Sequence, residues 1–564
     1  MTESATAQAP VAEPEGIKET VESIIVALIL AFVFRAFIVE AFVIPTGSMA
    51  PTLYGAHGTL VCQDCGFEFA YGLRDLDDHR RTVPVLGKSR ATCPNCNHAN
   101  TNLKFSDDKR NREKGDRILV LKWPLHIGGR LLDPARWDVT VFKDPSDGTT
   151  NFIKRLVGLP NEVLMIRDGD VYAVPLDELS VGVRTELERI RHQKFQLRTR
   201  LRFGVLDRPS VEVLAELDEK MRVQRKTPAA QKALWYPVYH HDYPPSTLDA
   251  GQPYWASGKG QASGWDTSGR TLVFARTQVD EDFIELRGKD IRATCAYNIH
   301  SRQTSPPVSD LRIRLVFTPK DDDATLLVRL DKLDRTFWAT VQADGLVTLV
   351  ESRDVPSDAS RVLATKQLPP FVAGRSVRIS FENVDYRLAL RVGGEEVLAS
   401  SDDPTSPAWY APDLRAFRAN RRQRSTSRPP RLYGWQGAFE IAHLAVDRDE
   451  YYYHDPAFRA LPMSWAPRMG WASPANPIVL RGHEFFMLGD NTTASKDSRL
   501  WDVVGKHFQA RGEDFQLGTV PRDQLIGKAF FVYWPSGHRL SWLPIPSLRR
   551  FGMIPDVGRM RWIR

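Results

Sequence analysis

A lysine inside an apolar stretch is the first residue of this sequence that suggests chemistry. Lys154 stands within residues 152–157 (FIKRLV), which have the composition of a strand. Strand alternation places it on the same face as Phe152 and Leu156. An ordinary lysine has a pKa of about 10.4, so roughly one amine in a thousand is neutral near pH 7.4. Apolar burial lowers the pKa of a lysine. A neutral amine activates a serine hydroxyl by removing its proton. The alternative is an exposed lysine on a surface strand.

Four cysteines form a second group with chemical meaning. Cys62 and Cys65 make one C-x-x-C pair, and Cys93 and Cys96 make another after a loop of about 27 residues. Paired knuckles of this kind are typical of a zinc ribbon, in which four thiolates close the coordination sphere and leave no site for water. We therefore expect a structural zinc. Two disulfides are the alternative, which an oxidising compartment would favour. Cys295 is left over and is expected to be a buried thiol.

An N-terminal apolar run is the element that would hold this chemistry at a membrane. Residues 24–34 (IIVALILAFVF) are unbroken apolar sequence, and the run continues to residue 44 past Arg35 and Glu40. About 20 residues suffice to cross a bilayer core of about 30 Å. We expect a cytoplasmic tail at residues 1–20 and a transmembrane helix at residues 21–40. A cleavable signal peptide fits poorly because the leader carries more acidic than basic residues.

The rest of the chain predicts a mainly β fold. Short strands with turn signals occupy residues 41–178, followed by charged, helix-like sequence over residues 179–235. Residues 236–453 show many short alternating strands, typical of a β-sandwich. Buried-strand character returns over residues 480–564. We therefore predict one β-rich domain at residues 41–178 and 480–564, with a zinc-ribbon insertion at 61–100, a helical linker at 179–235 and a β-sandwich insertion at 236–453.

Composition narrows the possible partners. The 564 residues are 42% hydrophobic and 26% charged, with a net charge of +7. This charge is spread over the chain, and basic runs are short, so nucleic acid is not an expected partner. The sandwich suggests a glycan or another ligand of the cell envelope. Trp255, Trp265 and Trp338 are candidates for stacking on sugar rings, although core packing is the expected role of each.

Five segments in order resemble the type I signal peptidase family, whose members use a Ser–Lys dyad. They are residues 45–53 (PTGSMAPTL), 115–122 (GDRILVLK), 138–145 (DVTVFKDP), 152–162 (FIKRLVGLPNE) and 489–499 (GDNTTASKDSR). The resemblance covers about half of the chain and implies that residues 41–178 and 480–564 form a β-barrel-like catalytic domain. The zinc ribbon, and an insertion that loosely resembles a laminin-G or concanavalin-like jelly roll, lie outside the usual pattern of the family.

The resemblance implies roles for residues at the matching positions. Ser48 would be the nucleophile and Lys154 the general base, with Ser495 orienting the lysine amine. The Ser48 backbone N–H and the Thr46 hydroxyl would form the oxyanion hole. Asp497 and Arg499 would form a supporting ion pair. The pockets for small substrate residues would be lined by Phe42, Ile44, Pro45 and Ile153.

Three positions depart from the family pattern without removing a reacting group. Thr46 stands where serine is common, and its methyl group restricts the rotamer. Trp137 and Asn161 stand where glycine is frequent, and asparagine tolerates left-handed backbone geometry. We therefore expect activity to be retained.

A mechanism based on His57, nine positions after Ser48, is a weaker alternative.

The resulting hypothesis is a single-pass protein of the cytoplasmic (inner) membrane. Its catalytic domain would lie on the periplasmic, outer face, close to the lipid, and would remove signal peptides from exported precursors. It would need no cofactor for catalysis. One alternative is a catalytically idle membrane receptor that binds envelope ligands through the zinc ribbon and the sandwich. Another is a Ser–Lys regulator that cuts its own chain.

Overall fold

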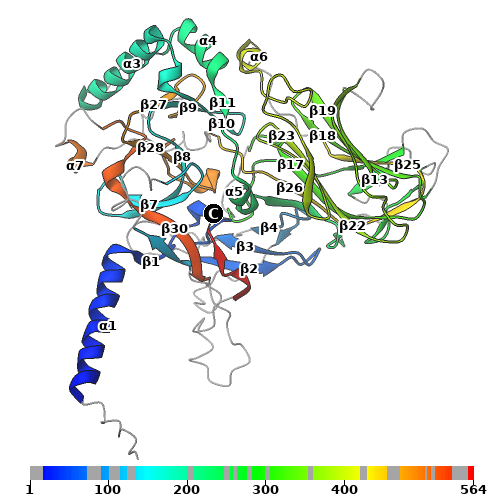
Figure 1. Cartoon of the computed structure of the whole chain (residues 1–564), viewed down its shortest axis with the longest axis horizontal. Coiled ribbons are helices and arrows are strands. Elements are labelled where there is room, and N and C mark those ends of the chain that lie inside the picture. The colour runs from blue at the N-terminus through cyan, green and yellow to red at the C-terminus, as the bar shows by residue number, and fades with distance from the viewer. Residues whose placement is uncertain are drawn as a thin grey trace, which may run out of the picture.

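The computed structural model is mainly β, with one long helix at the N-terminus (Figure 1). It describes residues 17–72, 91–100, 115–122, 134–200, 208–246, 254–257, 263–275, 282–298, 305–352, 360–419, 428–453, 470–501, 505–509, 515–535 and 557–563. Most of the predicted cytoplasmic tail, the centre of the predicted zinc ribbon and residues 420–427 lie outside these ranges. The predicted fold class is confirmed, whereas the predicted domain boundaries stay predictions.

Helix α1 (Ile17–Phe37) leaves the body beside strand β1 (Val39–Val43) (Figure 1). Residues Glu19–Phe37 are long and apolar enough to cross a membrane, and none of this window is buried against the protein. The helix ends at Phe37, so the apolar run that continues to residue 44 is not one helix. The last part of this apolar run forms strand β1, which pairs with β6. Val39 and Val43 are β-branched and therefore favour a strand.

One eight-stranded antiparallel sheet carries the family-like segments. Its order is β1-β6-β30-β7-β8-β28-β29, and β31 pairs with β30. The strands after β1 are β6 (Arg117–Leu121), β7 (Val139–Lys143), β8 (Asn151–Gly158), β28 (Glu484–Leu488), β29 (Val520–Pro521), β30 (Leu525–Trp534) and β31 (Arg561–Trp562). Strands from both ends of the chain therefore form one sheet, and β1 lies at its edge.

A second sheet of four strands packs beside the first. Its order is β11-β10-β9-β27, with β9 (Glu162–Arg167), β10 (Asp170–Pro175), β11 (Arg222–Val223) and β27 (Ile478–Leu480). The β9–β10 turn places Gly169 at φ +95°, a backbone conformation that glycine adopts readily in a hairpin. The charged stretch that follows forms α3 (Val181–Arg200), α4 (Val211–Lys220) and α5 (Pro228–Ala233).

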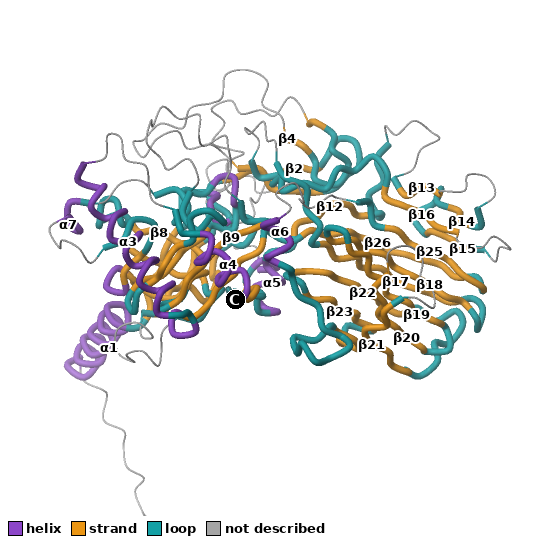
Figure 2. Tube along the Cα trace, turned by 90° about the horizontal axis from the view of Figure 1, so that it is seen from above, coloured by secondary structure: helices purple, strands orange, loops and turns teal. Residues whose placement is uncertain are grey.

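The central part of the chain forms two large antiparallel sheets that share one apolar core (Figure 2). The first sheet contains β12 (Tyr236–His240), β14 (Trp265–Asp266), β15 (Leu272–Phe274), β17 (Leu311–Pro319), β22 (Val377–Val384), β23 (Arg387–Val392), β24 (Glu395–Ala399) and β26 (Phe439–Arg448). The second contains β13 (Trp255–Ser257), β16 (Asp282–Leu286), β18 (Ala324–Lys332), β19 (Arg335–Gln342), β20 (Leu346–Ser352), β21 (Arg361–Gln367) and β25 (Arg431–Gln436). The predicted sandwich is therefore present. Helices α6 (Leu414–Ala419) and α7 (Lys506–Gln509) are short.

Buried ion pairs join the sandwich to the four-stranded sheet. Lys332 of β18 bonds Asp310 and lies 3.1 Å from the Asp170 carboxylate on β10, and all three side chains are buried. Lys226 bonds Asp385 at 2.6 Å. Breaking a buried pair is costly because the remaining charge has no partner. These contacts fix the sandwich against the catalytic body.

Candidate active site

Ser48 and Lys154 are in direct contact although 106 positions separate them in sequence. Ser48 lies in the short helical turn η1 (Gly47–Met49), and Lys154 lies on β8. The Lys154 amine donates a hydrogen bond to Ser48 Oγ at 2.8 Å and another to the Ile153 carbonyl at 3.0 Å. Both side chains are buried. When the amine is neutral, the 2.8 Å contact allows it to accept the hydroxyl proton instead.

Burial changes the charge of the lysine amine. Desolvation lowers the pKa of Lys154 to about 8, against the opposing pull of the carboxylates of Asp497, Asp490 and Asp144. The Phe152 ring lies 5.3 Å from the amine. With a pKa near 8, roughly a quarter of the molecules carry a neutral amine at pH 7.5. The arrangement thus supplies a base near neutral pH.

An ion pair behind the lysine holds β8 against the last family-like segment. Arg155 Nε and Nη2 bond the two Asp490 carboxylate oxygens at 2.7 and 2.6 Å, and neither side chain is exposed. Arg155 Nη1 also bonds the Trp137 carbonyl at 2.6 Å. Burial alone would lower the pKa of Arg155, but Asp490 raises it, so the guanidinium stays charged. Sequence reasoning missed both residues, because strand alternation gave no reason for a second buried cation beside Lys154.

The Asp497–Arg499 contact expected from the sequence is present. Arg499 bonds the Asp497 carboxylate through Nε at 2.9 Å and Nη2 at 2.7 Å, and the Gly489 N–H donates to the same carboxylate at 2.9 Å. A Cβ on Gly489 would overlap the Ser495 side chain and lie 2.6 Å from the Ser48 carbonyl oxygen. Glycine is therefore needed at position 489 for the last segment to approach the serine turn.

Ser495 lies near Ser48 without the contact to the Lys154 amine that was expected of it, and Thr46 lies two residues before Ser48. Ser495 is fully buried, but no hydrogen bond joins its hydroxyl to the Lys154 amine in the part of the chain described. The amine bonds the Ile153 carbonyl instead. Thr46 is exposed two residues before Ser48, with an extended backbone. The roles of both residues stay predictions.

Three of the four predicted pocket residues belong to one apolar cluster. Ile44 and Ile153 are buried in a cluster with Met49, and Phe42 packs against it from a half-buried position. Pro45 is exposed at the end of the same segment. The segment around β1, strand β8 and the serine turn therefore contribute side chains to one apolar cluster that contains Met49.

Both departures at glycine-like positions adopt left-handed backbone. Asn161 has φ +64°, which asparagine tolerates well. Trp137 has φ +77°, an unfavourable conformation for a bulky side chain. The indole compensates through burial, a 2.7 Å hydrogen bond to the Arg225 carbonyl and stacking on Tyr452.

The alternative base, His57, contacts the Gly55 carbonyl at 2.7 Å rather than Ser48.

The four cysteines predicted as metal ligands come together at the tips of two hairpins. These hairpins are β2 (His57–Val61) with β3 (Glu68–Gly72), and β4 (Ala91–Thr92) with β5 (Ala99–Asn100). All four thiols are free and buried, and the Sγ atoms lie within 4.8 Å of one another. The distances from Cys62 to Cys96 and from Cys65 to Cys93 are 3.5 and 3.7 Å. Zn–S bonds of about 2.3 Å in a tetrahedron require sulfur separations of about 3.8 Å. The donor set therefore fits zinc.

Asp170, Asp310 and Asp385 form a second group with carboxylate oxygens close enough for a metal ion. The ammonium groups of Lys332 and Lys226 already bond these oxygens. The group is therefore an ion-pair network, and the cations it requires are supplied by the protein itself.

Three segments of this chain, including those that carry Ser48 and Lys154, match a known protein family. The family model described as "Signal peptidase, peptidase S26" matches residues 17–76, 100–200 and 463–534. Signal peptidase I of Pseudomonas fluorescens is 34% identical over 137 residues, which are 24% of this chain and 30% of that protein. Signal peptidase I of Rickettsia bellii (strain OSU 85-389) is 25% identical over 179 residues, covering 31% of this chain and 46% of that protein. This chain spans less than half the length of either relative.

Among solved structures, this chain matches several proteins at low similarity. A carbohydrate-binding module from Bacillus subtilis aligns over 36% of this chain and 99% of its own, with 14% identity and a TM-score of 0.22. The laminarinase catalytic domain of Thermotoga maritima aligns over 38% of this chain and 98% of its own, with 12% identity and a TM-score of 0.26. These scores do not establish a shared fold, so the predicted laminin-G or concanavalin-like class stays a prediction.

Proposed function

We propose that this chain belongs to the type I signal peptidase family, whose model matches three of its segments, and that it removes signal peptides from exported precursors. It would do so as a membrane-bound serine endopeptidase with Ser48 as the nucleophile and Lys154 as the general base. The observation that carries the proposal is the 2.8 Å contact between the buried lysine amine and the serine hydroxyl.

The reaction follows from that contact. The neutral Lys154 amine takes the proton from Ser48 Oγ while the oxygen attacks the carbonyl carbon of the scissile peptide bond. The Ser48 N–H and the exposed Thr46 hydroxyl would stabilise the oxyanion. The lysine ammonium then gives its proton to the departing amine, leaving an acyl group on Ser48. Lys154 next deprotonates a water molecule, which releases the signal peptide and restores Ser48.

The substrate would bind in an extended conformation as an added strand. In the described sheet, β1 pairs on one side with β6, and its other edge has no partner strand. Backbone hydrogen bonds at such an edge hold a peptide whatever its sequence, while pockets beside it select side chains. The apolar cluster containing Ile44 and Ile153 lies next to this edge. It would favour small residues before the cut.

The membrane topology is part of the proposal. Helix α1 would be a single transmembrane anchor, with the catalytic body on the periplasmic face of the inner membrane. Ser48 follows the helix end at Phe37 after only eleven residues, so the serine must lie near the lipid surface. A signal peptide that is still in the bilayer would therefore present its cleavage site at the correct height.

Mapping the cut in a model precursor tests this function. The full-length protein in detergent should release a mature chain whose N-terminus follows a small-x-small sequence, as read by mass spectrometry. The precursor with large residues at both small positions serves as the control and should remain uncut. Cleavage elsewhere in the precursor, or cleavage of the protein's own chain alone, would contradict the assignment and favour the self-cutting alternative.

The value of kcat/KM for precursor cleavage should fall as pH decreases below about 8. Burial places the folded-state pKa of Lys154 at about 8, below its ordinary value of 10.5, so the reactive neutral amine becomes more abundant as pH rises through 8. The logarithm of kcat/KM should increase with a slope of one up to about pH 8 and then level off. Initial rates at subsaturating precursor between pH 6 and 10 measure this. A midpoint near 6.5 would instead indicate a histidine base.

The four-cysteine cluster would hold a structural zinc ion in this proposal. The support is the fit of its sulfur separations to tetrahedral coordination. Zinc would fasten the two hairpins together beside the serine segment and would take no part in the cleavage reaction, because four thiolates leave no open coordination position.

Metal analysis distinguishes zinc from disulfides. We expect about one zinc per full-length chain by elemental mass spectrometry, because four ligands fill one tetrahedral site. Cys96→Ser should lose most of it, whereas the matched Cys295→Ala variant should keep it because Cys295 lies outside the cluster. A metal-free protein whose mass is lower by about 4 Da would show two disulfides instead.

The sandwich would bind a glycan or another ligand of the cell envelope. The three tryptophans considered for sugar stacking are buried, and Trp255 and Trp338 are not exposed at all. A groove of about 650 Å³ lies over β17, β22 and β23, and four of the arginines that line it, Arg312, Arg314, Arg387 and Arg391, bond the carboxylates of Asp447, Glu382 and Glu396. The idle-receptor alternative gains no support from the Ser48–Lys154 contact.

A further inference from the structure

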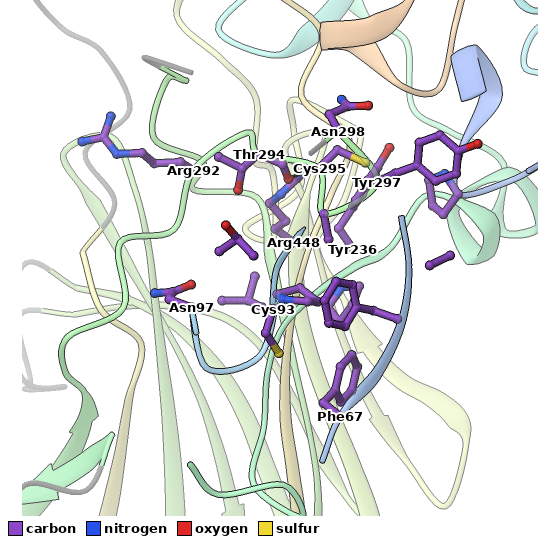
Figure 3. A pocket seen from close by; sticks show the side chains of 18 of the residues that line it. Phe67, Cys93, Asn97, Tyr236, Arg292, Thr294, Cys295, Tyr297, Asn298 and Arg448 are labelled. Atoms are coloured by element: carbon purple, nitrogen blue, oxygen red, sulfur yellow. Dashed lines mark hydrogen bonds between the residues drawn. The ribbon is translucent and has the colours of Figure 1, made fainter. Parts of the chain in front are cut away.

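A segment of the sandwich reaches the serine turn. Residues 289–298 lie between β16 and β17, outside the three segments that match the signal peptidase family. They border a cavity of about 440 Å³ between the cysteine hairpins and the sandwich (Figure 3). At the start of this segment, the Lys289 amine bonds the Pro94 and Asn95 carbonyls at 2.6 Å each. At its end, Tyr297 and Asn298 lie against the serine turn.

Asn298 is joined to the last family-like segment by a pair of reciprocal hydrogen bonds. Its amide donates to Asn491 Oδ1 and to Thr493 Oγ1, both at 2.6 Å, and accepts from Asn491 Nδ2 at 2.8 Å. Asn491 Nδ2 also donates to the Gly47 carbonyl at 2.9 Å, and the Asn491 N–H donates to the Ser48 carbonyl at 3.1 Å. Asn298 therefore fixes the Asn491 side chain, which bonds the Gly47 carbonyl, while the Asn491 backbone N–H bonds the Ser48 carbonyl.

Tyr297 covers the same turn from another side. A Cβ on Gly47 would overlap its ring, and its hydroxyl donates to the Ala56 carbonyl at 3.0 Å. The ring stacks on Tyr54 with centroids 5.7 Å apart, and the Tyr297 carbonyl accepts from the Gly72 N–H at 2.7 Å. The segment is thus anchored to the cysteine hairpins and to the serine turn at once.

We propose that Asn298 is a positioning residue: through Asn491 it holds the Ser48 hydroxyl within reach of the Lys154 amine. The inference rests on the proposed function and extends it. The sandwich is then a working part of the active site as well as a ligand-binding module. Small displacements of a nucleophile from its base reduce turnover strongly, so the effect should fall on kcat rather than on substrate binding.

The test compares three variants of the full-length protein in detergent. Asn298→Ala removes both hydrogen bonds between Asn298 and the Asn491 side chain and should lower kcat 10- to 50-fold, with KM for the precursor within twofold of wild type. Asn298→Asp keeps the oxygen that accepts from Asn491 Nδ2 but loses the amide donors. Its kcat should therefore lie between those of Asn298→Ala and wild type. Lys366→Ala, exposed on β21, is the matched control and should match wild type.

A second readout separates this inference from the proposed function. An alanine-terminated peptide p-nitrophenyl ester acylates a reactive serine and releases nitrophenolate in a burst. Asn298→Ala should slow this burst as much as it lowers kcat, while the thermal midpoint stays within about 3 °C of wild type. If wild type gives the burst without cutting any precursor, the proposed function fails and the positioning role is still measured. Unchanged burst and kcat in Asn298→Ala, or losses that follow a lower thermal midpoint, would overturn the inference.

Discussion

Replacing Lys154 with methionine is expected to abolish cleavage and to stabilise the folded protein. Methionine removes the only side chain that bonds Ser48 Oγ in the described structure, so kcat should fall by about 10⁴-fold or more, as when a serine enzyme loses its base. Burial of the amine lowers its pKa by about 2.5 from 10.5, which costs about 3 kcal/mol near neutral pH. Methionine has a similar shape and no such cost. We expect a gain of about 1–3 kcal/mol.

Precursor cleavage and denaturant unfolding of the same preparation measure the two effects. Ser48→Ala is the matched control, since it should lose as much activity as Lys154→Met without gaining the stability. The stability gain should also shrink as pH rises from 8 and vanish above 10.5, where the folded and unfolded amines are both neutral. Residual cleavage by Lys154→Met above one hundredth of wild type would rule out Lys154 as the base.

Replacing Arg155 with methionine should destabilise the protein by about 3–5 kcal/mol, since it leaves the Asp490 carboxylate buried without its partner. The loss of the bond to the Trp137 carbonyl adds to the effect. The double variant Arg155→Met with Asp490→Leu removes both charges and should recover a large part of that loss. Chemical denaturation of the full-length protein gives these free energies of unfolding.

The matched control is an exposed ion pair of similar length. Arg415 and Glu219 lie 2.5 Å apart, with side chains 63% and 61% exposed. Arg415→Ala should change the free energy of unfolding by less than about 1 kcal/mol. A double variant as unstable as the sum of its single variants would show that Arg155 and Asp490 act independently, contrary to the geometry.

The elements of this fold were predictable where one physical signal was strong. The strand around Lys154 and the turn at Gly169 follow from alternation and from glycine geometry, and both are present. The end of α1 was placed too late, because hydrophobicity does not distinguish a membrane helix from the edge strand that follows it. Only the pairing of β1 with β6 settles that boundary.

The site was predictable as a set of residues but not as a set of contacts. Family-like segments indicated Ser48 and Lys154, and the structure brings them together. The same segments contain Arg155 and Asp490, whose pairing joins residues 335 positions apart and leaves no local signal. Asn298 lies beyond any such signal, because its role depends on how an insertion folds back onto the body.

The short connection between α1 and the serine turn has a kinetic consequence. If the helix lies in the bilayer, catalyst and precursor share one surface and meet by lateral diffusion. Their collision frequency then depends on the number of molecules per unit area rather than per unit of aqueous volume. Extra empty lipid should dilute the reaction at constant bulk concentration, and crowding of the membrane should accelerate it until the turnover of each molecule becomes limiting.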